Sequence, residues 1–171
     1  IASVAHQYLW LTDAYFVGVS AYVDALTSAA RDGVDVRLLV PGSGSDITAV
    51  QRLTRAGYRS LLEGGVRVFE WNGSMMHAKT AVADKQWARV GSTNLNVQSW
   101  LGNWELDVAV EDARFGEEMH AMYETDLGNA TEIVLSRRRV RPTHQEPRQR
   151  PRGRLGRTSR AAAGALRIGN T

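Results

Sequence analysis

The chain has 171 residues, of which 43% are hydrophobic, and a formal net charge of +3. This length suits one domain with a substantial core and is too short for two. No apolar run approaches the roughly 18 residues that span a bilayer, and the first residues do not follow a signal-peptide pattern, so no transmembrane segment is predicted. Cysteine is absent, which excludes disulfide scaffolds, thiolate zinc sites and a cysteine nucleophile.

The charge is divided unevenly along the chain. Residues 1–136 hold ten Lys/Arg and 17 Asp/Glu, a net of −7, whereas residues 137–171 hold 11 Arg and one acid, a net of +10. The second segment is rich in Pro, Gln, Gly and Ser and poor in large apolar residues, a composition typical of disorder. We therefore expect a folded, acidic lobe over 1–136 and a disordered, Arg-rich tail over 137–171. The high pI is not a nucleic-acid signature of the fold.

The first half of the chain alternates strand-like and helix-like patterns. Residues 8–12 form a short apolar run that ends at Asp13, and apolar residues recur at helical spacing over 19–31. Gly33 then favours the end of that helix. The next elements are a buried strand at 34–40, a helix capped by Ser45 or Asp46 that runs to residue 63, and a strand at 66–71.

After residue 73 the pattern changes to consecutive strands. Residues 77–83 and 87–90 are joined by Asp84-Lys85-Gln86, which predicts a hairpin. Strands separated by helices and followed by a hairpin predict an α/β fold, with a mixed sheet flanked by helices. The remaining elements of the lobe are a strand at 105–110, a helix over 112–127 and a further helical turn or two over 130–135.

Polar side chains gather around the predicted hairpin. His77 and Lys79 are two residues apart in a strand, so their side chains share one face. Ser92 and Asn94 have the same relationship at the end of the partner strand. The pattern therefore predicts that an imidazole, an ammonium, a hydroxyl and a carboxamide converge on one small volume.

This set of groups suits a phosphodiester. Lys79 supplies a fixed positive charge, and Ser92 and Asn94 supply donors for the non-bridging oxygens, which gain negative charge in the transition state. His77 can attack phosphorus or transfer a proton, because the reference pKa of imidazole lies near neutrality. Glu105 can hold the remote ring nitrogen of this histidine and fix its tautomer.

These residues follow a recognisable spacing. His77, Lys79 and Asp84 fit H-x-K-x-x-x-x-D, and Gly91-Ser92-Thr93-Asn94 and Glu105 follow. With this set the chain resembles the phospholipase D superfamily, specifically its bacterial cardiolipin synthase-like branch. The likeness covers residues 7–136 and includes Asp13-Ala14-Tyr15-Phe16, Gly33-Val34-Asp35-Val36-Arg37-Leu38, Pro41-Gly42 with Ser45-Asp46, and Gly65-Val66-Arg67-Val68.

The resemblance implies a phospholipase D-like lobe in a two-lobed enzyme whose two motifs face each other across one pocket. One histidine forms a phosphohistidine, the other protonates the leaving alcohol, and neither a metal nor another cofactor is required. The chain has one copy of the motif, so the second lobe is expected in sequence before Ile1 or, as the alternative, in a second chain. By this resemblance His77 is assigned as the acid/base, and the nucleophile role stays open.

The resemblance also implies roles for single residues. The catalytic set is His77, Lys79, Asp84 and Glu105, and the substrate phosphate is bound by Lys79, Ser92 and Asn94. Asp84 has the other strand parity and lies at the turn, so a structural role suits it better than substrate contact. Tyr15 and Phe16 follow the first strand, at the family's pocket rim, and are candidates for that rim.

Two groups of residues have competing interpretations. Trp100, Leu101 and Trp104 lie beside the motif, and core packing is favoured over a wall for acyl chains. The Arg-rich tail is interpreted first as a solvated extension. Its alternatives are attraction to an anionic membrane surface, worth about 1 kcal/mol per basic residue near the headgroups, and binding of nucleic acid.

The predicted function is metal-independent cleavage or transfer of a phosphodiester on phospholipids, by a phosphatidyltransferase or phospholipase D. The first alternative is a nuclease of the same superfamily, and the second is a non-catalytic lobe that binds phosphate. The acidic lobe argues against a nucleic-acid partner, because a DNA track requires a basic groove. The expected location is the cytoplasm or the inner membrane face, as a peripheral protein.

Overall fold

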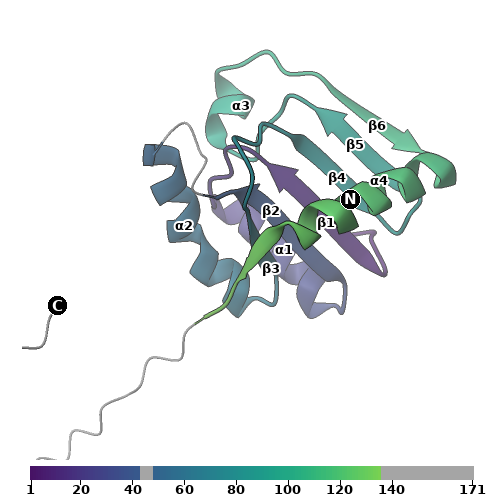
Figure 1. Ribbon diagram of the computed structural model, residues 1–171, viewed down its shortest axis with the longest axis horizontal. Coiled ribbons are helices and arrows are strands. Elements are labelled where there is room, and N and C mark those ends of the chain that lie inside the picture. Colours follow the sequence, from purple (N-terminus) through teal and green to yellow (C-terminus); the bar gives the residue numbers. More distant parts are fainter. Residues whose placement is uncertain (43–47, 136–171) are drawn as a thin grey trace, which may run out of the picture. The chain divides into compact units, whose positions relative to one another are not determined.

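The computed structural model of the protein describes residues 1–42 and 48–135 (Figure 1). The predicted tail and the predicted helix start at Ser45 or Asp46 lie outside these residues. Within the described part, the strands form one seven-stranded sheet in the order β6-β5-β4-β1-β2-β3-β7. The strands are β1 (Tyr8–Asp13), β2 (Asp35–Pro41), β3 (Arg67–Trp71), β4 (Lys79–Ala83), β5 (Trp87–Gly91), β6 (Asp107–Glu111) and β7 (Ala130–Ile133). The helices are α1 (Ser20–Arg31), α2 (Thr48–Glu63), α3 (Val97–Leu101) and α4 (Ala113–Gly128).

The sheet is mixed, as the sequence predicts. Strands β1, β2 and β3 are parallel, and α1 and α2 connect them. Strands β4, β5 and β6 continue the sheet from β1 in antiparallel order, and β4 pairs with β1 so that Lys79 lies opposite Asp13. The start of β4 and the end of β1 therefore lie side by side, at the same end of the sheet's strands.

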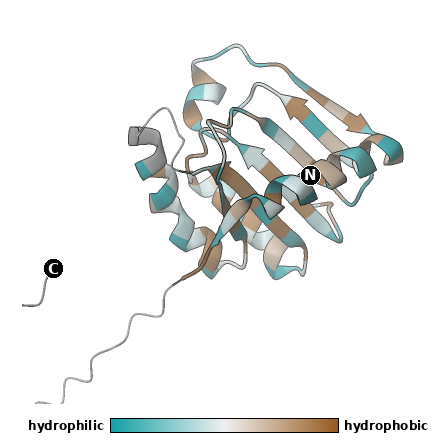
Figure 2. Ribbon diagram, in the orientation of Figure 1, coloured by the Kyte–Doolittle hydropathy of each residue, from teal (hydrophilic) through white to brown (hydrophobic). Residues whose placement is uncertain are grey.

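Helices cover both faces of the sheet and give three layers. One apolar cluster lies between the sheet and helices α1 and α2, and a second lies between the sheet and α4 (Figure 1). Figure 2 shows hydrophobic residues along the strands and hydrophilic residues on the outer sides of the helices. The helices contribute Leu26 and Ala29 from α1, Tyr58 and Leu61 from α2, and Met119, Tyr123 and Leu127 from α4.

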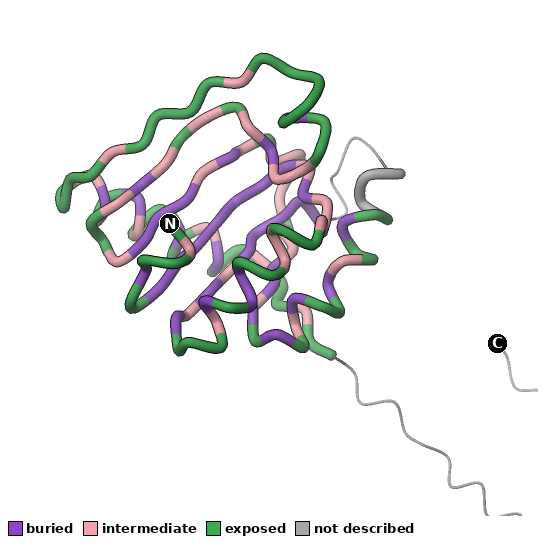
Figure 3. The backbone as a smooth tube through the Cα atoms, turned by 180° about the vertical axis from the view of Figure 1, so that it is seen from behind, coloured by how far each residue is buried: buried purple, intermediate pink, exposed green. Residues whose placement is uncertain are grey.

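One edge of the sheet is far less covered than its centre. The central strands are buried, whereas β6 and the segment that leads into it are exposed (Figure 3). Strands β1 and β2 contain few polar residues, because helices pack on both of their faces. The burial of the sheet thus decreases from its parallel centre toward β6.

The turn between β4 and β5 has an unusual backbone. Asp84 and Lys85 have φ of 52° and 54°, and the N–H of Gln86 donates to the carbonyl of Ala83 at 3.1 Å. Positive φ at both central residues is the requirement of a type I′ turn, whose twist matches that of the flanking strands. Helix α4 passes close to this turn, because a Cβ on Gly116 would lie 2.5 Å from the backbone of Lys85.

The prediction for residues 130–135 is wrong. Instead of a helical turn, residues 130–133 form β7, which pairs antiparallel with β3. Ion pairing across the two strands, between Arg67 and Glu132 at 2.8 Å, supports this arrangement. Pairing with the open edge of β3 satisfies backbone groups that one isolated helical turn leaves unpaired.

The described helices are all too short or too polar to cross a bilayer.

Candidate active site

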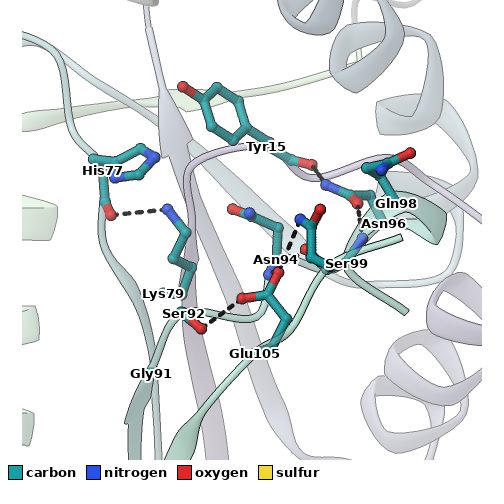
Figure 4. A pocket seen from close by; sticks show the side chains of 11 residues that line it. Tyr15, His77, Lys79, Gly91, Ser92, Asn94, Asn96, Gln98, Ser99 and Glu105 are labelled. Atoms are coloured by element: carbon teal, nitrogen blue, oxygen red, sulfur yellow. Dashed lines mark hydrogen bonds between the residues drawn. The ribbon is translucent and has the colours of Figure 1, made fainter. Parts of the chain in front are cut away.

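A pocket of about 640 Å³ opens where four segments of the lobe meet. These segments are the end of β1, the approach to β4, the end of β5 with α3, and the approach to β6 (Figure 4). Its lining is Tyr15, His77, Lys79, Gly91, Ser92, Asn94, Asn96, Gln98, Ser99, Asn103 and Glu105. Five of the predicted site residues, His77, Lys79, Ser92, Asn94 and Glu105, are therefore brought together.

His77 and Lys79 form one side of the pocket together with Tyr15. His77 precedes β4 and is exposed, whereas Lys79, the first residue of β4, is only 6% exposed. The ammonium of Lys79 donates to the carbonyl of His77 at 3.0 Å and lies 5.4 Å from the centre of the Tyr15 ring. The rings of Tyr15 and His77 meet edge to face, with their centres 5.3 Å apart. A cation held this deep beside an imidazole can stabilise charge that develops on a bound phosphoryl group.

Glu105 and Ser92 form the opposite side of the pocket. The Ser92 hydroxyl donates to the Glu105 carboxylate at 2.5 Å and accepts the N–H of Leu106 at 3.0 Å. The second carboxylate oxygen accepts from Asn103 at 3.1 Å. Hydrogen bonds from Ser92, Ser99 and Asn103 lower the pKa of Glu105, which keeps it ionised.

These contacts differ from the prediction for Glu105. Within the described residues, no hydrogen bond joins Glu105 to His77. The carboxylate instead accepts hydrogen bonds from Ser92 and Asn103 on its own side of the pocket. The hydroxyl of Ser92 is likewise engaged with this carboxylate rather than directed freely into the pocket.

Asn94 lies at the floor of the pocket. It is 8% exposed, its N–H donates to the Ser99 hydroxyl at 3.2 Å, and its side-chain oxygen is buried without a hydrogen-bond partner. A buried polar atom without a partner costs free energy unless a ligand satisfies it. An Asn side chain carries both an acceptor oxygen and a donor NH2, so this group can offer either to a substrate.

Asn96 and Ser99 organise the loop that carries Asn94. Asn96 caps α3, with its side-chain oxygen accepting the N–H of Ser99 at 3.0 Å, and its amide donates to the carbonyl of Tyr15 at 2.9 Å. Neither residue was singled out from the sequence. Helix α3 has five residues, too few for a periodic pattern, and the Asn cap followed three residues later by a serine is the only local signal.

Asp13 was also not predicted as a site residue. It is 1% exposed at the end of β1, directly behind the pocket, and it accepts the backbone N–H groups of Tyr15 and Leu95 at 2.9 and 2.6 Å. Burial raises its pKa to about 6, although the two N–H bonds and the charges of Lys79 and Arg89 act in the other direction.

Asp84 does not reach the pocket. It lies in the hairpin turn at the other end of β4, about 17 Å along the strand from Lys79 at roughly 3.3 Å per residue. Its carboxylate accepts the backbone N–H groups of His6, Gln7 and Tyr8 at 2.7, 2.9 and 2.9 Å. Burial acts to raise its pKa, but these three bonds lower it overall.

Other sequence-based expectations need correction. Phe16 is fully buried in the core beside α1 and α2, so of the two rim candidates only Tyr15 lines the pocket. The aromatic and aliphatic side chains of Trp100, Leu101 and Trp104 are exposed, Trp104 completely so, and do not pack in the core as favoured. Burial of apolar residues depends on which elements cover them, and none of the elements in residues 1–42 and 48–135 covers the segment from α3 to β6.

Among the described residues, no cluster of three or more His, Asp or Glu side chains has the arrangement of a metal site. The charged groups that line the pocket are the cation Lys79 and the anion Glu105, and His77 adds an imidazole. The pocket is thus equipped for proton transfer and for stabilising an anion.

Comparison with known proteins places the chain in a family. The family profile described as the cardiolipin synthase, phospholipase D-like domain matches residues 2–127. Cardiolipin synthase A of Pseudomonas aeruginosa (strain LESB58) is 36% identical over 137 residues, which are 80% of this chain and 28% of that protein. Cardiolipin synthase A of Proteus mirabilis (strain HI4320) is 33% identical over 138 residues, 81% of this chain and 28% of that protein.

A solved structure has the same fold. The phospholipase D family member Nuc from Salmonella typhimurium aligns with a TM-score of 0.68 at 18% identity, over 78% of this chain and 86% of that one. The chain spans only about 28% of the length of the curated relatives named above. The extent and identity of these matches show that the chain belongs to the cardiolipin synthase, phospholipase D-like domain family.

Proposed function

We propose that this lobe supplies one half of an active site that cleaves a phospholipid phosphodiester and transfers the phosphatidyl group to an alcohol or to water. The observation that carries the proposal is the convergence of His77, Lys79 and the Asn94 side chain, whose oxygen has no hydrogen-bond partner, on one pocket. The names of the relatives, cardiolipin synthase A, support a phospholipid as the substrate class.

The chemistry proceeds in two steps through a phosphohistidine. A nucleophilic imidazole attacks phosphorus, a P–N bond forms, and the P–O bond to the leaving alcohol breaks as that oxygen takes a proton from a second imidazole. An acceptor alcohol or water then gives its proton to the second imidazole and attacks phosphorus, and the P–N bond breaks. We assign His77 to the second, acid/base role and the nucleophile to a partner lobe.

Lys79 and Asn94 bind the phosphate in this scheme, and no metal takes part. The positive charge of a nearly buried lysine interacts strongly with a phosphoryl oxygen because little water screens it. Ser92 joins them when the substrate displaces its bond to Glu105. Asp84 contributes through the fold rather than through contact with substrate.

The scheme requires a second lobe with its own histidine and lysine. The exposed side chains of Trp100, Leu101, Trp104 and Leu106, which we call the apolar rim, lie beside the pocket and suit such a partner. Exposed tryptophans are typical anchors of protein interfaces. Residues 90–113 contain no Lys or Arg, so this segment offers no cationic attraction to an anionic bilayer.

The test uses the full-length gene product that contains this segment, with phosphatidylglycerol vesicles and excess metal chelator, and lipids measured by mass spectrometry. Cardiolipin or phosphatidic acid should appear with the unmutated protein and not with His77→Ala, and the ratio of the products identifies the acceptor. If both proteins are inactive on lipid, the proposal fails. Digestion of single-stranded DNA under the same conditions would then favour the nuclease, and binding of a phosphate analogue without turnover the non-catalytic lobe.

A further inference from the structure

Asp13 connects two segments that are far apart in sequence and that both carry pocket residues. One carboxylate oxygen accepts the N–H of Tyr15, two residues along the chain, at 2.9 Å. The other accepts the N–H of Leu95, which is 82 residues away, at 2.6 Å. Tyr15 lines the pocket, and Leu95 lies between the pocket residues Asn94 and Asn96.

Two further hydrogen bonds join the same segments. The N–H of Val17 donates to the carbonyl of Leu95 at 3.1 Å, and the amide of Asn96 donates to the carbonyl of Tyr15 at 2.9 Å. The backbone N–H and C=O groups of both Tyr15 and Leu95 are thus engaged between the segments or with Asp13. We call this set of bonds the Asp13 clamp.

The side chain of Asp13 is charged at neutral pH despite its burial, because its pKa of about 6 lies below neutrality. Three groups on neighbouring elements face it, namely Lys79 on β4, Arg89 on β5 and the hydroxyl of Tyr22 on α1. Ionising a carboxylate this deep costs free energy, and an Asn or Ser side chain could accept a backbone N–H without that cost. The carboxylate of Asp13, unlike a cap of the turn after β1 alone, also accepts the N–H of a distant segment through its second oxygen.

We propose that Asp13 is a positioning residue of the active site, whose carboxylate holds the Tyr15 and Asn94–Asn96 sides of the pocket in register, and that its protonation loosens the clamp. An ionised carboxylate accepts both N–H bonds at once, with one on each oxygen. A protonated carboxyl turns one oxygen into an O–H donor, which weakens one of the two bonds. The clamp is closed at neutral pH and loosens as the pH falls through about 6, because burial raises the pKa of Asp13 to about 6.

Amide resonances of this chain report the clamp directly. In ¹⁵N-labelled protein titrated from pH 8 to pH 5, the amide protons of Tyr15 and Leu95 should shift together with one midpoint near pH 6. After correction for intrinsic rates, exchange of the Leu95 amide should become faster by about tenfold or more at pH 5, the change expected for loss of one hydrogen bond to a charged group.

Matched variants separate Asp13 from other titrating groups. The shared midpoint should persist in His77→Ala, which removes the neighbouring imidazole, and should vanish in Asp13→Asn. Asp112→Asn is the control, because Asp112 also accepts a backbone N–H, from Phe115, but lies at the start of α4 away from the pocket. Should Asp13→Asn fail to fold, the unmutated and His77→Ala titrations still decide. Tyr15 and Leu95 amides that do not titrate together, or that lose the midpoint in His77→Ala, overturn the proposal.

Turnover provides a second arm, which rests on the proposed function. In the full-length protein at pH 7.5, Asp13→Asn should lower kcat by about tenfold to a hundredfold, as misplaced binding groups do, whereas Asp112→Asn should not. A kcat and KM equal to those of the unmutated protein would refute the positioning role. If no variant and no unmutated protein acts on lipid, the proposed function fails, and the amide titration still decides the clamp.

Discussion

The two ends of β4 carry residues of the same sequence motif but have different environments. At its start, Lys79 is nearly buried beside His77 and an open pocket. Beyond its end, Asp84 accepts three backbone N–H groups in a hairpin turn and contacts no pocket residue among those described. One end faces an open pocket, and the other has its carboxylate satisfied by backbone N–H groups of the fold.

This difference shows that one sequence motif can contain both residues that line a pocket and residues that stabilise the fold. The positive φ of Asp84 and Lys85 is unfavourable for residues with a side chain. The three N–H bonds compensate by fixing the turn to the start of β1. The fixed turn also sets the register of β4 against β1, in which Ala83 lies opposite Leu9 and Lys79 lies opposite Asp13. The turn end therefore sets the strand position on which the pocket end depends.

The largest effect is expected at His77. His77→Ala in the full-length protein should reduce lipid turnover by about 10²- to 10⁴-fold, the usual contribution of a general acid or base. The side chain is exposed and packs in no core cluster, so the unfolding midpoint of this chain should not change. Turnover by mass spectrometry and thermal unfolding by circular dichroism measure both, and an active His77→Ala protein would assign the chemistry elsewhere.

Lys79→Met should come next, with a loss of about 10²- to 10³-fold, because it removes one electrostatic contact in the transition state. Methionine keeps most of the side-chain volume, so the lobe should remain folded. Steady-state kinetics should show the loss chiefly in kcat, since the charge matters most when the phosphoryl group gains negative charge. A change confined to KM would instead indicate that Lys79 binds ground and transition states equally.

Asp84→Ala should affect stability rather than chemistry. Loss of the acceptor for three N–H groups should lower the free energy of unfolding by about 1–2 kcal/mol, a range reduced for the solvent exposure of this turn. Urea denaturation of the chain measures the change, and kcat per folded molecule should be retained. A pH series sharpens the result. The folded pKa of Asp84 lies below its ordinary value of 3.8, so its stabilisation is complete well above pH 4 and disappears as the pH falls through the folded value.

The smallest effect on the lobe itself is expected at the apolar rim. Leu106→Asp should leave the unfolding free energy almost unchanged, because Leu106 is 76% exposed, but should weaken pairing with a second lobe. Val134→Asp is a matched control at 77% exposure on a different part of the surface. With a second copy of this chain standing in for the partner lobe, sedimentation of the 171-residue chain over a concentration series should show self-association that only Leu106→Asp reduces. Equal behaviour of the two variants would remove the rim from the partner interface.

The sequence predicts most of the fold and the centre of the site for physical reasons. The spacing predicted that His77, Lys79, Ser92 and Asn94 lie on one side of a hairpin, and all four line one pocket. Only Lys79 lies within a strand, because β4 begins at Lys79 and β5 ends at Gly91. The contacts of Glu105 were not predictable in this way, since it lies in an irregular segment whose course depends on Ser92 and Asn103. β7 was missed because a four-residue strand at a sheet edge is defined by its partner rather than by its own pattern.

Asp13 and the apolar rim both show that local sequence patterns do not decide whether a residue is buried. The burial of Asp13 follows from tertiary contacts with a segment 82 residues away, which no local pattern reveals. Trp100 in α3 and Trp104 before β6 are exposed because none of the elements that the structure describes covers them. Hydrophobicity indicates that a residue favours burial, but the arrangement of elements decides whether this lobe provides it.

The most direct test of the account measures His77→Ala and Asp84→Ala side by side, with lipid turnover in the full-length protein and unfolding free energy in this chain. The account predicts that His77→Ala loses turnover and keeps stability, whereas Asp84→Ala loses stability and keeps turnover per folded molecule. If Asp84→Ala instead lost turnover at unchanged stability, the division of the motif between its two ends would be contradicted.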